Sequence, residues 1–266
     1  MRAAAAAWAR ERPDAQVEER VVEDPEGRGL AWARNRGLEA ARGDYVFFAD
    51  ADDTVEAGFF ARPVARLEAT GADFCLFEYD DAPLKRDYEL EGNEAVRAAL
   101  LPAFVGYSLA DVRRFNAGGR LDANREPGSV CRVAFRREFL ARHALRFDER
   151  LFIYEDAPFM AECALCAGRV TFLRERLYRY EPGPSGITAT VTGTRRHRDY
   201  KFAVHDLRLG LEARYGGVWR YCEASAALTA LEFLRGGRLI ACARYCTRPR
   251  VISALCRFPW SWRWLR

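Results

Sequence analysis

Three aspartates follow a short apolar run within four positions of the chain. Residues 45–49 are all apolar, which is typical of a short strand buried on both faces, and Asp50, Asp52 and Asp53 come directly after it. Like charges repel, so a packed core has no use for this cluster. Because open α/β sheets bind ligands at the carboxyl ends of buried parallel strands, the pattern indicates a site for a divalent cation and a phosphate. The simpler alternative is that Asp52 or Asp53 only caps a helix starting near Val55.

A second acidic pair, Glu155 and Asp156, precedes Pro158 at the start of a helix expected to run to about Ala167. Proline suits the first helical turn, so both carboxylates stand at the amino-terminal entrance, where the macrodipole favours their charged form. A helix-start acid without chemistry is the common alternative. The apolar residues that precede this pair of acids in the sequence favour a functional role for Glu155 and Asp156.

The elements around the aspartates alternate as in an α/β protein. The spacing of apolar residues predicts a helix over about 30–41 and another over about 57–69, on either side of the strand at 45–49. A second buried strand is expected over 74–77. Strand, helix and strand in this order predict a right-handed parallel crossover.

The remaining segments carry weaker patterns. A strand is expected over 16–22 and another over 130–135. Residues 104–125 are irregular, which is typical of a substrate-facing loop, with a disordered insertion as the alternative. Residues 182–186 are a candidate lid, and 201–247 are expected to form two or three helices.

Composition limits the classes of function. The net charge of +4 over 266 residues does not argue for nucleic acid. We find neither an adequate signal-peptide core nor an uncharged apolar run of about 18 residues, so no membrane-spanning helix is expected. The eight cysteines are scattered and are expected to be free thiols of a reducing cytoplasm. The cysteine pairs at 163/166 and 242/246 have no supporting histidine and make a weak zinc alternative.

Several blocks of sequence resemble family 2 glycosyltransferases with the GT-A fold, and in particular the bacterial capsule and lipopolysaccharide branch. The blocks are Gly29–Leu38, Ala41–Asp53, Arg136–Leu140, Phe147–Glu149, Tyr154–Asp156, Tyr178–Tyr180 and Ser185–Thr188. The likeness covers roughly residues 14–190. It implies an α/β GT-A domain over 1–190, with a mostly parallel sheet flanked by helices, and a helical C-terminal extension over 191–266.

The resemblance implies inverting transfer of a sugar from a nucleoside diphosphate to a hydroxyl of a cell-surface glycan or lipid-linked acceptor. Asp52 would be the principal ligand of Mn²⁺ or Mg²⁺ held against the diphosphate, and Asp50 would support the metal and face the ribose or donor sugar. Asp156 would be the general base for the acceptor hydroxyl, and Glu155 beside it would raise its pKa.

Further donor contacts are expected from basic and amide side chains. Arg34 and Asn35 match positions that line the donor side in the family. Arg195, Arg196 and His197 form a basic cluster that we assign to the diphosphate, with a plain solvated helix face as the alternative.

The chain departs from the family pattern at its beginning. Members start with a strand ending in a Pro-Val-Tyr-Asn-like motif and a second strand ending in Asp-Asp-Gly-Ser, and neither occurs here. We therefore expect a domain without the strands that hold the nucleotide base. Either upstream sequence is missing, or the chain is an inactive remnant that acts as a binding or scaffold subunit.

A haloacid-dehalogenase-type phosphohydrolase is the enzymatic alternative. Asp50-Ala51-Asp52-Asp53-Thr54 fits that superfamily's Asp-x-Asp-x-Thr motif, with Asp50 as nucleophile and Asp52 as acid/base. However, neither Lys85 nor Lys201 has suitable surroundings for its phosphate-binding lysine, and its later acidic metal motif is missing.

The end of the chain, Arg257–Arg266, interleaves tryptophan with arginine. Such tails favour anionic membrane surfaces, and packing onto the domain is the equal alternative. We expect a cytoplasmic protein, with peripheral contact at the inner face of the plasma membrane left open. Donor nucleotide, sugar and acceptor are not legible from the sequence.

Overall fold

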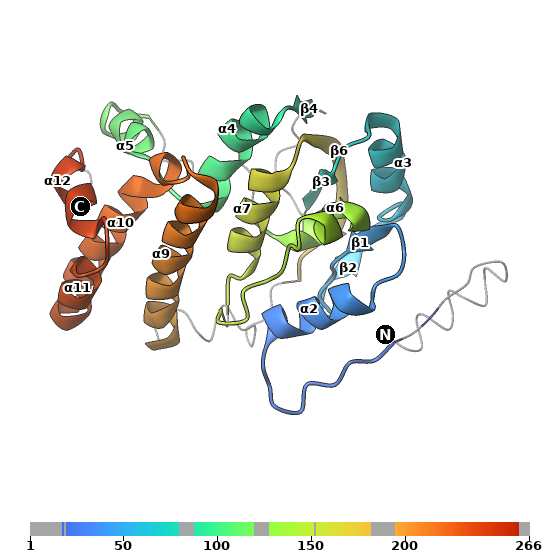
Figure 1. Ribbon diagram of the computed structural model, residues 1–266, viewed down its shortest axis with the longest axis horizontal. Coiled ribbons are helices and arrows are strands. Elements are labelled where there is room, and N and C mark those ends of the chain that lie inside the picture. Colours follow the sequence, from blue (N-terminus) through green and yellow to red (C-terminus); the bar gives the residue numbers. More distant parts are fainter. Residues whose placement is uncertain are drawn as a thin grey trace.

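Figure 1 shows the computed structural model of the protein. The structure describes residues 18, 20–79, 88–119, 128–151, 153–181 and 195–260, and for Arg195 and Arg196 it describes the backbone alone. The candidate lid over 182–186 and the tail beyond Trp260 lie outside these residues.

A six-stranded sheet forms the centre of the fold. Its strands lie in the order β1 (Tyr45–Phe47), β5 (Val133–Arg136), β3 (Phe74–Tyr79), β6 (Arg169–Arg179) and β2 (Thr54–Val55), and β4 (Tyr88–Glu91) also pairs with β6. In the described part of the chain only β3 and β6 pair in parallel, while the other four pairings are antiparallel. The sequence-based prediction of a mostly parallel sheet is therefore wrong.

β5 lies between the two strands expected to be neighbours. Both β1 and β3 run antiparallel to β5, so they point the same way, as a parallel crossover requires, but they are not adjacent. Val133, Ala134 and Phe135 are all buried. A continuous apolar run is typical of parallel strands, yet this antiparallel strand shows the same pattern because apolar groups cover both of its faces.

Alternate residues of the central strands face two apolar clusters. Phe74 and Phe135 belong to the main core, whereas Cys75 and Ala134 pack with Leu67 of α3 in a smaller cluster. This two-residue period is that of a strand covered on both sides. The helices that supply the cover are α3 (Ala61–Thr70) for the smaller cluster and α4 (Asn93–Phe104), α6 (Arg137–Arg142) and α7 (Asp156–Cys166) for the main core.

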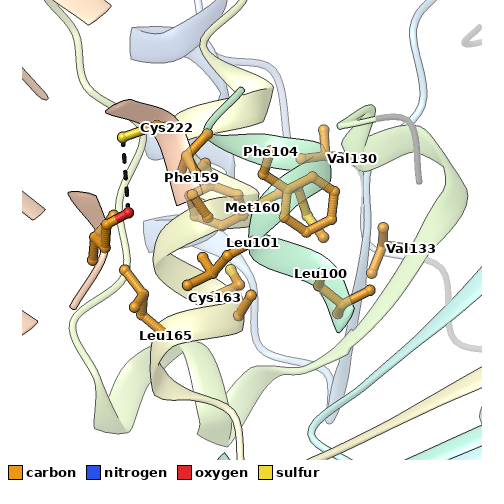
Figure 2. Close-up of a cluster of buried hydrophobic side chains, with 14 of the residues drawn as sticks. Leu100, Leu101, Phe104, Val130, Val133, Phe159, Met160, Cys163, Leu165 and Cys222 are labelled. Carbon is orange, nitrogen blue, oxygen red and sulfur yellow. Dashed lines mark hydrogen bonds between the residues drawn. The ribbon is translucent and has the colours of Figure 1, made fainter. Parts of the chain in front are cut away.

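Figure 2 shows the contact between α4 and α7 in the main core. Leu101 and Phe104 of α4 lie beside Phe159 and Met160 of α7, and Cys222 of α10 approaches from the C-terminal helices. All five side chains are buried. Because α7 begins with the acidic pair, this packing fixes the position of Glu155 and Asp156.

Truncation of this contact is expected to lower stability. Leu101 is completely buried, so Leu101→Ala should reduce the free energy of unfolding by about 3 kcal/mol through lost apolar contact and the cavity left behind. The matched control is Leu239→Ala, at a leucine that is 67% exposed, which should change it by less than about 0.5 kcal/mol. Urea unfolding followed by circular dichroism measures both. Equal losses would contradict the assigned core.

Two sequence-based predictions fail near the sheet. The strand expected over 16–22 is not formed in residues 18 and 20–22, and Val21 is 57% exposed. The segment expected to be irregular over 104–125 contains α5 (Leu109–Asn116). Ser108 and Asp111 form a capping box at its start, in which the Ser108 hydroxyl accepts from the Asp111 amide at 3.2 Å.

In the described part of the chain, four helices follow the sheet. They are α9 (Arg195–Tyr215), α10 (Trp219–Arg235), α11 (Leu239–Cys246) and α12 (Val251–Arg257). α9 packs on α7, and α10 packs on α4 and α5, so their apolar residues join the main core (Figure 1). In the described chain no single helix has the length and apolar character to cross a membrane, and only the α4–α5 pair, bent by 64°, reaches that limit by length and composition.

Candidate active site

Three separate segments contribute residues to one cavity and to the ion pairs beside it. They are α2 (Leu30–Ala40), the turn between β1 and β2, and the start of α7, which are neighbours in Figure 1. The cavity has a volume of about 480 Å³, and its lining includes Asp50, Asp53, Cys131, Tyr154, Asp156 and Tyr178. Asp50 and Asp53 of the first acidic group and Glu155 and Asp156 of the second therefore share one cavity, whose lining does not include Asp52.

Arg34 of α2 joins the two acidic groups. Its Nη2 lies 3.1 Å from Asp50 Oδ1, and its Nη1 forms ion pairs with both Glu155 and Asp156. The Arg34 side chain is only 9% exposed. One buried guanidinium thus faces three carboxylates from two distant parts of the chain, and the cluster carries excess negative charge when all three are ionised.

This excess charge and the burial set the protonation of the cluster. Burial raises the pKa of Asp156 to about 7; Arg34 opposes this shift, while the Glu155 and Asp50 carboxylates add to it. Burial also raises the pKa of Glu155, against the opposing effect of Arg34. The three carboxylates outweigh burial at Arg34 and raise its pKa. A carboxyl whose pKa lies near neutrality can accept a proton at neutral pH.

The raised pKa of Asp156 predicts that stability falls as the pH rises from about 4 to about 7. Its ordinary pKa is 3.8, so in this window the folded chain holds a proton that the unfolded chain has released. The stabilisation is complete below about pH 4 and is lost as the pH passes about 7. Differential scanning calorimetry should show wild type losing melting temperature relative to Asp156→Asn across this window. A difference that does not change with pH would contradict the shift.

Tyr178 organises the turn that carries the three aspartates. Its hydroxyl oxygen accepts from the Asp50 amide at 3.1 Å and its proton goes to the Asp53 carboxylate, which also accepts from the Glu181 amide at 2.9 Å. β2 pairs with the end of β6, which places Tyr178 beside the turn. The sequence reasoning did not assign Tyr178 or Asp53 to the site, although the resemblance included Tyr178–Tyr180.

Aromatic side chains of α9 pack against Tyr154, the residue that precedes Glu155. Tyr154 has a φ of 56°, an unusual backbone conformation for a residue other than glycine. Its ring lies 4.9 Å from the ring of Tyr200 and 6.2 Å from that of His197. These contacts stabilise the turn into α7. His197, expected at the diphosphate, thus packs against the residue that precedes the acidic pair.

The other predicted donor residues either lie outside the lining of the cavity or have side chains that the structure does not describe. Asn35 is buried, donates to the Phe147 carbonyl and to Glu149 Oε1 at 2.9 Å each, and accepts from the Phe147 amide. It ties α2 to the segment before α7 and does not line the cavity, so we give it a structural role. Arg195 and Arg196 open α9, and their side chains are outside the described part of the structure.

The aspartate turn, residues 50–53, offers few ligands to a metal. Among the described residues, no three histidine, cysteine, aspartate or glutamate side chains are arranged to hold an ion. Asp52 is exposed and its carboxylate has no partner within the described chain. Since Mg²⁺ is commonly held by one or two carboxylates together with substrate phosphates, Asp52 fits the role of one ligand to a cation that a diphosphate brings. The metal itself stays a prediction.

Comparison with known sequences indicates the family. Residues 9–127, which include α2 and the aspartate turn, match the family model described as Glycosyl transferase family 2. Over these residues, a little under half of the chain, the protein is similar to family 2 glycosyltransferases. Since Asp50 and Asp52 lie inside the matched residues, the phosphohydrolase alternative is wrong.

Two curated bacterial proteins align with part of the chain. The uncharacterized glycosyltransferase EpsJ of Bacillus subtilis is 34% identical over 178 residues, which is 66% of this chain and 47% of EpsJ. The succinoglycan biosynthesis protein ExoO of Rhizobium meliloti is 33% identical over 161 residues, covering 59% of this chain and 42% of ExoO. The chain spans somewhat less than half the length of these relatives.

Solved structures show the fold. TarS of S. aureus, residues 1–349, matches with a TM-score of 0.52 at 16% identity, over 95% of this chain and 66% of TarS. The mixed sheet with its flanking helices is therefore the GT-A fold of the family 2 enzymes, as the resemblance predicted.

Proposed function

We propose that the chain catalyses inverting transfer of a sugar from a nucleoside-diphosphate sugar to a hydroxyl of a cell-surface glycan or lipid-linked acceptor. The observation that carries this proposal is a cavity lined by both Asp50 and Asp156, with Arg34 paired to both carboxylates. Similarity to family 2 glycosyltransferases supports it, as does ExoO, described as a succinoglycan biosynthesis protein. TarS, with a TM-score of 0.50 and 16% identity, has been solved in complex with UDP-GlcNAc.

Asp156 is the general base in this proposal. Its Oδ1 pairs with Arg34 and its Oδ2 accepts from the Val130 amide at 3.3 Å, so the carboxylate is held at the wall of the cavity. With a pKa of about 7 it can take the proton of the acceptor hydroxyl as that oxygen attacks the anomeric carbon. Glu155 shares Arg34 and keeps negative charge beside the base, which maintains its basicity.

Asp52 holds the cation in this proposal, and Asp50 faces the donor. A Mn²⁺ or Mg²⁺ ion, when bound, neutralises negative charge on the departing diphosphate. The exposed carboxylate of Asp52 remains available to such an ion, whereas Asp50 is oriented by the ion pair with Arg34 and by the hydrogen bond from its backbone N–H to the Tyr178 hydroxyl. Arg195 and Arg196 are proposed diphosphate contacts on the strength of their charge and position at the start of α9.

A panel of nucleotide sugars tests the donor assignment by thermal shift with and without Mn²⁺. One member is expected to raise the melting temperature of the wild type only when Mn²⁺ is present. Asp52→Ala should weaken that binding by about tenfold or more, because the cation's contribution is lost. The matched control is Asp44→Ala, at an exposed aspartate beyond the opposite end of β1, which should bind as wild type does.

The panel also distinguishes an enzyme from an inactive remnant. If no nucleotide sugar stabilises the chain with or without Mn²⁺, the donor proposal is wrong and the binding-subunit alternative replaces it. If binding is unchanged in Asp52→Ala, the donor proposal stands and the ligand assignment of Asp52 is wrong.

A further inference from the structure

The end of the chain has a charge distribution unlike the rest. Residues 233–266 contain eight arginines and no acidic residue. Since the whole chain has 42 basic and 38 acidic residues, residues 1–232 are left with 34 basic and 38 acidic, a net charge of −4. The positive charge of the protein is therefore concentrated beyond the middle of α10, at the end of the molecule that Figure 1 places farthest from α3.

The same region exposes large apolar side chains. α11 buries Cys242 and Tyr245 and turns Leu239 and Ile240 outward, at 67% and 80% exposure. α12 buries Val251 and Ala254 and leaves Ile252 61% exposed. Trp260 follows α12 at 55% exposure. Each helix thus packs one side on the protein and presents large aliphatic side chains to solvent. Large exposed apolar patches are uncommon on soluble monomers and often mark an interaction site.

The arginines of this region divide into two groups. Arg248, Arg250 and Arg257 lie 3.3–3.5 Å from Asp206, Glu212 and Glu223, so they attach the last helices to α9 and α10. Arg235, Arg238 and Arg244 form no ion pair with any described residue. These three flank Leu239 and Ile240 in the sequence. Their guanidinium groups are therefore available to an external anion.

We infer that Leu239, Ile240 and Ile252, together with Arg235, Arg238 and Arg244, form a docking face for the surface of an anionic lipid bilayer. Interfacial helices insert aliphatic side chains at the headgroup boundary while adjacent arginines meet anionic headgroups. Trp260 suits the same boundary. A nucleic acid would use the arginines but has no use for exposed aliphatic side chains, so the combination favours lipid. The inference does not depend on the proposed transferase activity.

Co-sedimentation with phospholipid vesicles tests the docking face. Wild type should bind vesicles of about 30% phosphatidylglycerol in phosphatidylcholine, bind pure phosphatidylcholine poorly, and dissociate as salt rises from about 0.05 M to about 0.5 M. Each arginine near an anionic surface raises the affinity for that surface by a factor of about five. The triple variant R235Q/R238Q/R244Q should therefore bind the anionic vesicles about a hundredfold more weakly than wild type. Ile240→Ser should weaken binding several-fold without altering the net charge.

The control carries the same change of charge at another place. R42Q/R62Q/R142Q replaces three exposed arginines near α2, α3 and α6 and should keep wild-type binding. Circular dichroism establishes that each variant is folded. The inference is overturned if wild type does not bind the anionic vesicles, or if both triple variants lose binding equally. It is also overturned if the first triple variant keeps vesicle binding and instead loses binding to an oligonucleotide.

Discussion

Replacement of Asp156 by asparagine is expected to reduce sugar transfer by about 10²–10⁴-fold and to leave nucleotide-sugar binding unchanged. Asparagine keeps the shape of the side chain, and its single oxygen can still accept from either Arg34 or the Val130 amide. It cannot accept the proton of the acceptor hydroxyl. The loss should therefore appear in the rate of the chemical step and not in the affinity for the donor.

Release of the nucleoside diphosphate measures the rate, and the thermal shift by the donor measures binding. The matched control is Asp148→Asn, at an aspartate paired with Arg150 outside the cavity, which should retain wild-type turnover. Turnover in Asp156→Asn at a rate close to that of wild type would show that another group is the base.

Replacement of Arg34 by methionine is expected to lower the free energy of unfolding by about 3 kcal/mol at about pH 8. Methionine occupies a similar volume but leaves Asp50, Glu155 and Asp156 without their common cation. Ionised carboxylates then repel one another in a buried place. Near pH 5 the raised pKa of Asp156 leaves that carboxyl protonated, so the loss should be smaller.

Urea unfolding at the two pH values measures this difference. Arg28→Met is the matched control, because Arg28 is 41% exposed and lies outside the carboxylate cluster, and its substitution should cost less than about 0.5 kcal/mol. A loss of equal size at both pH values would mean that Arg34 stabilises the fold by packing and not by charge.

Local patterns predicted the elements that carry the site. The helix expected over 30–41 is α2, the strand expected over 45–49 contains β1, and the helix entered through Pro158 is α7. Each has a strong local signal: apolar residues at helical spacing, a short apolar run that ends in acids, or a proline in the first turn. The two acidic groups could for this reason be proposed as site residues before their contacts were known, whereas Arg34 was proposed from the family resemblance.

Contacts between distant segments could not be predicted in the same way. An apolar run such as Val133–Phe135 is equally compatible with a parallel and an antiparallel neighbour, so the place of β5 could not be read from it. The contact of Arg34 with Glu155 spans 121 residues, and that of Tyr178 with the Asp50 amide spans 128. The capping box of Ser108 and Asp111 is a local signal for α5. The surrounding stretch is rich in glycine, arginine and asparagine, which is typical of a loop and hides so short a helix.

The pH dependence of kcat/KM for diphosphate release, measured with the donor that the thermal-shift panel identifies, tests the central claim most directly. In the free enzyme Asp156 has a pKa of about 7, so kcat/KM should rise with pH through an apparent pKa near that value and then level off. A profile that is flat between about pH 5 and about pH 8, or one that keeps its shape in Asp156→Asn, would contradict the assignment of Asp156 as the base.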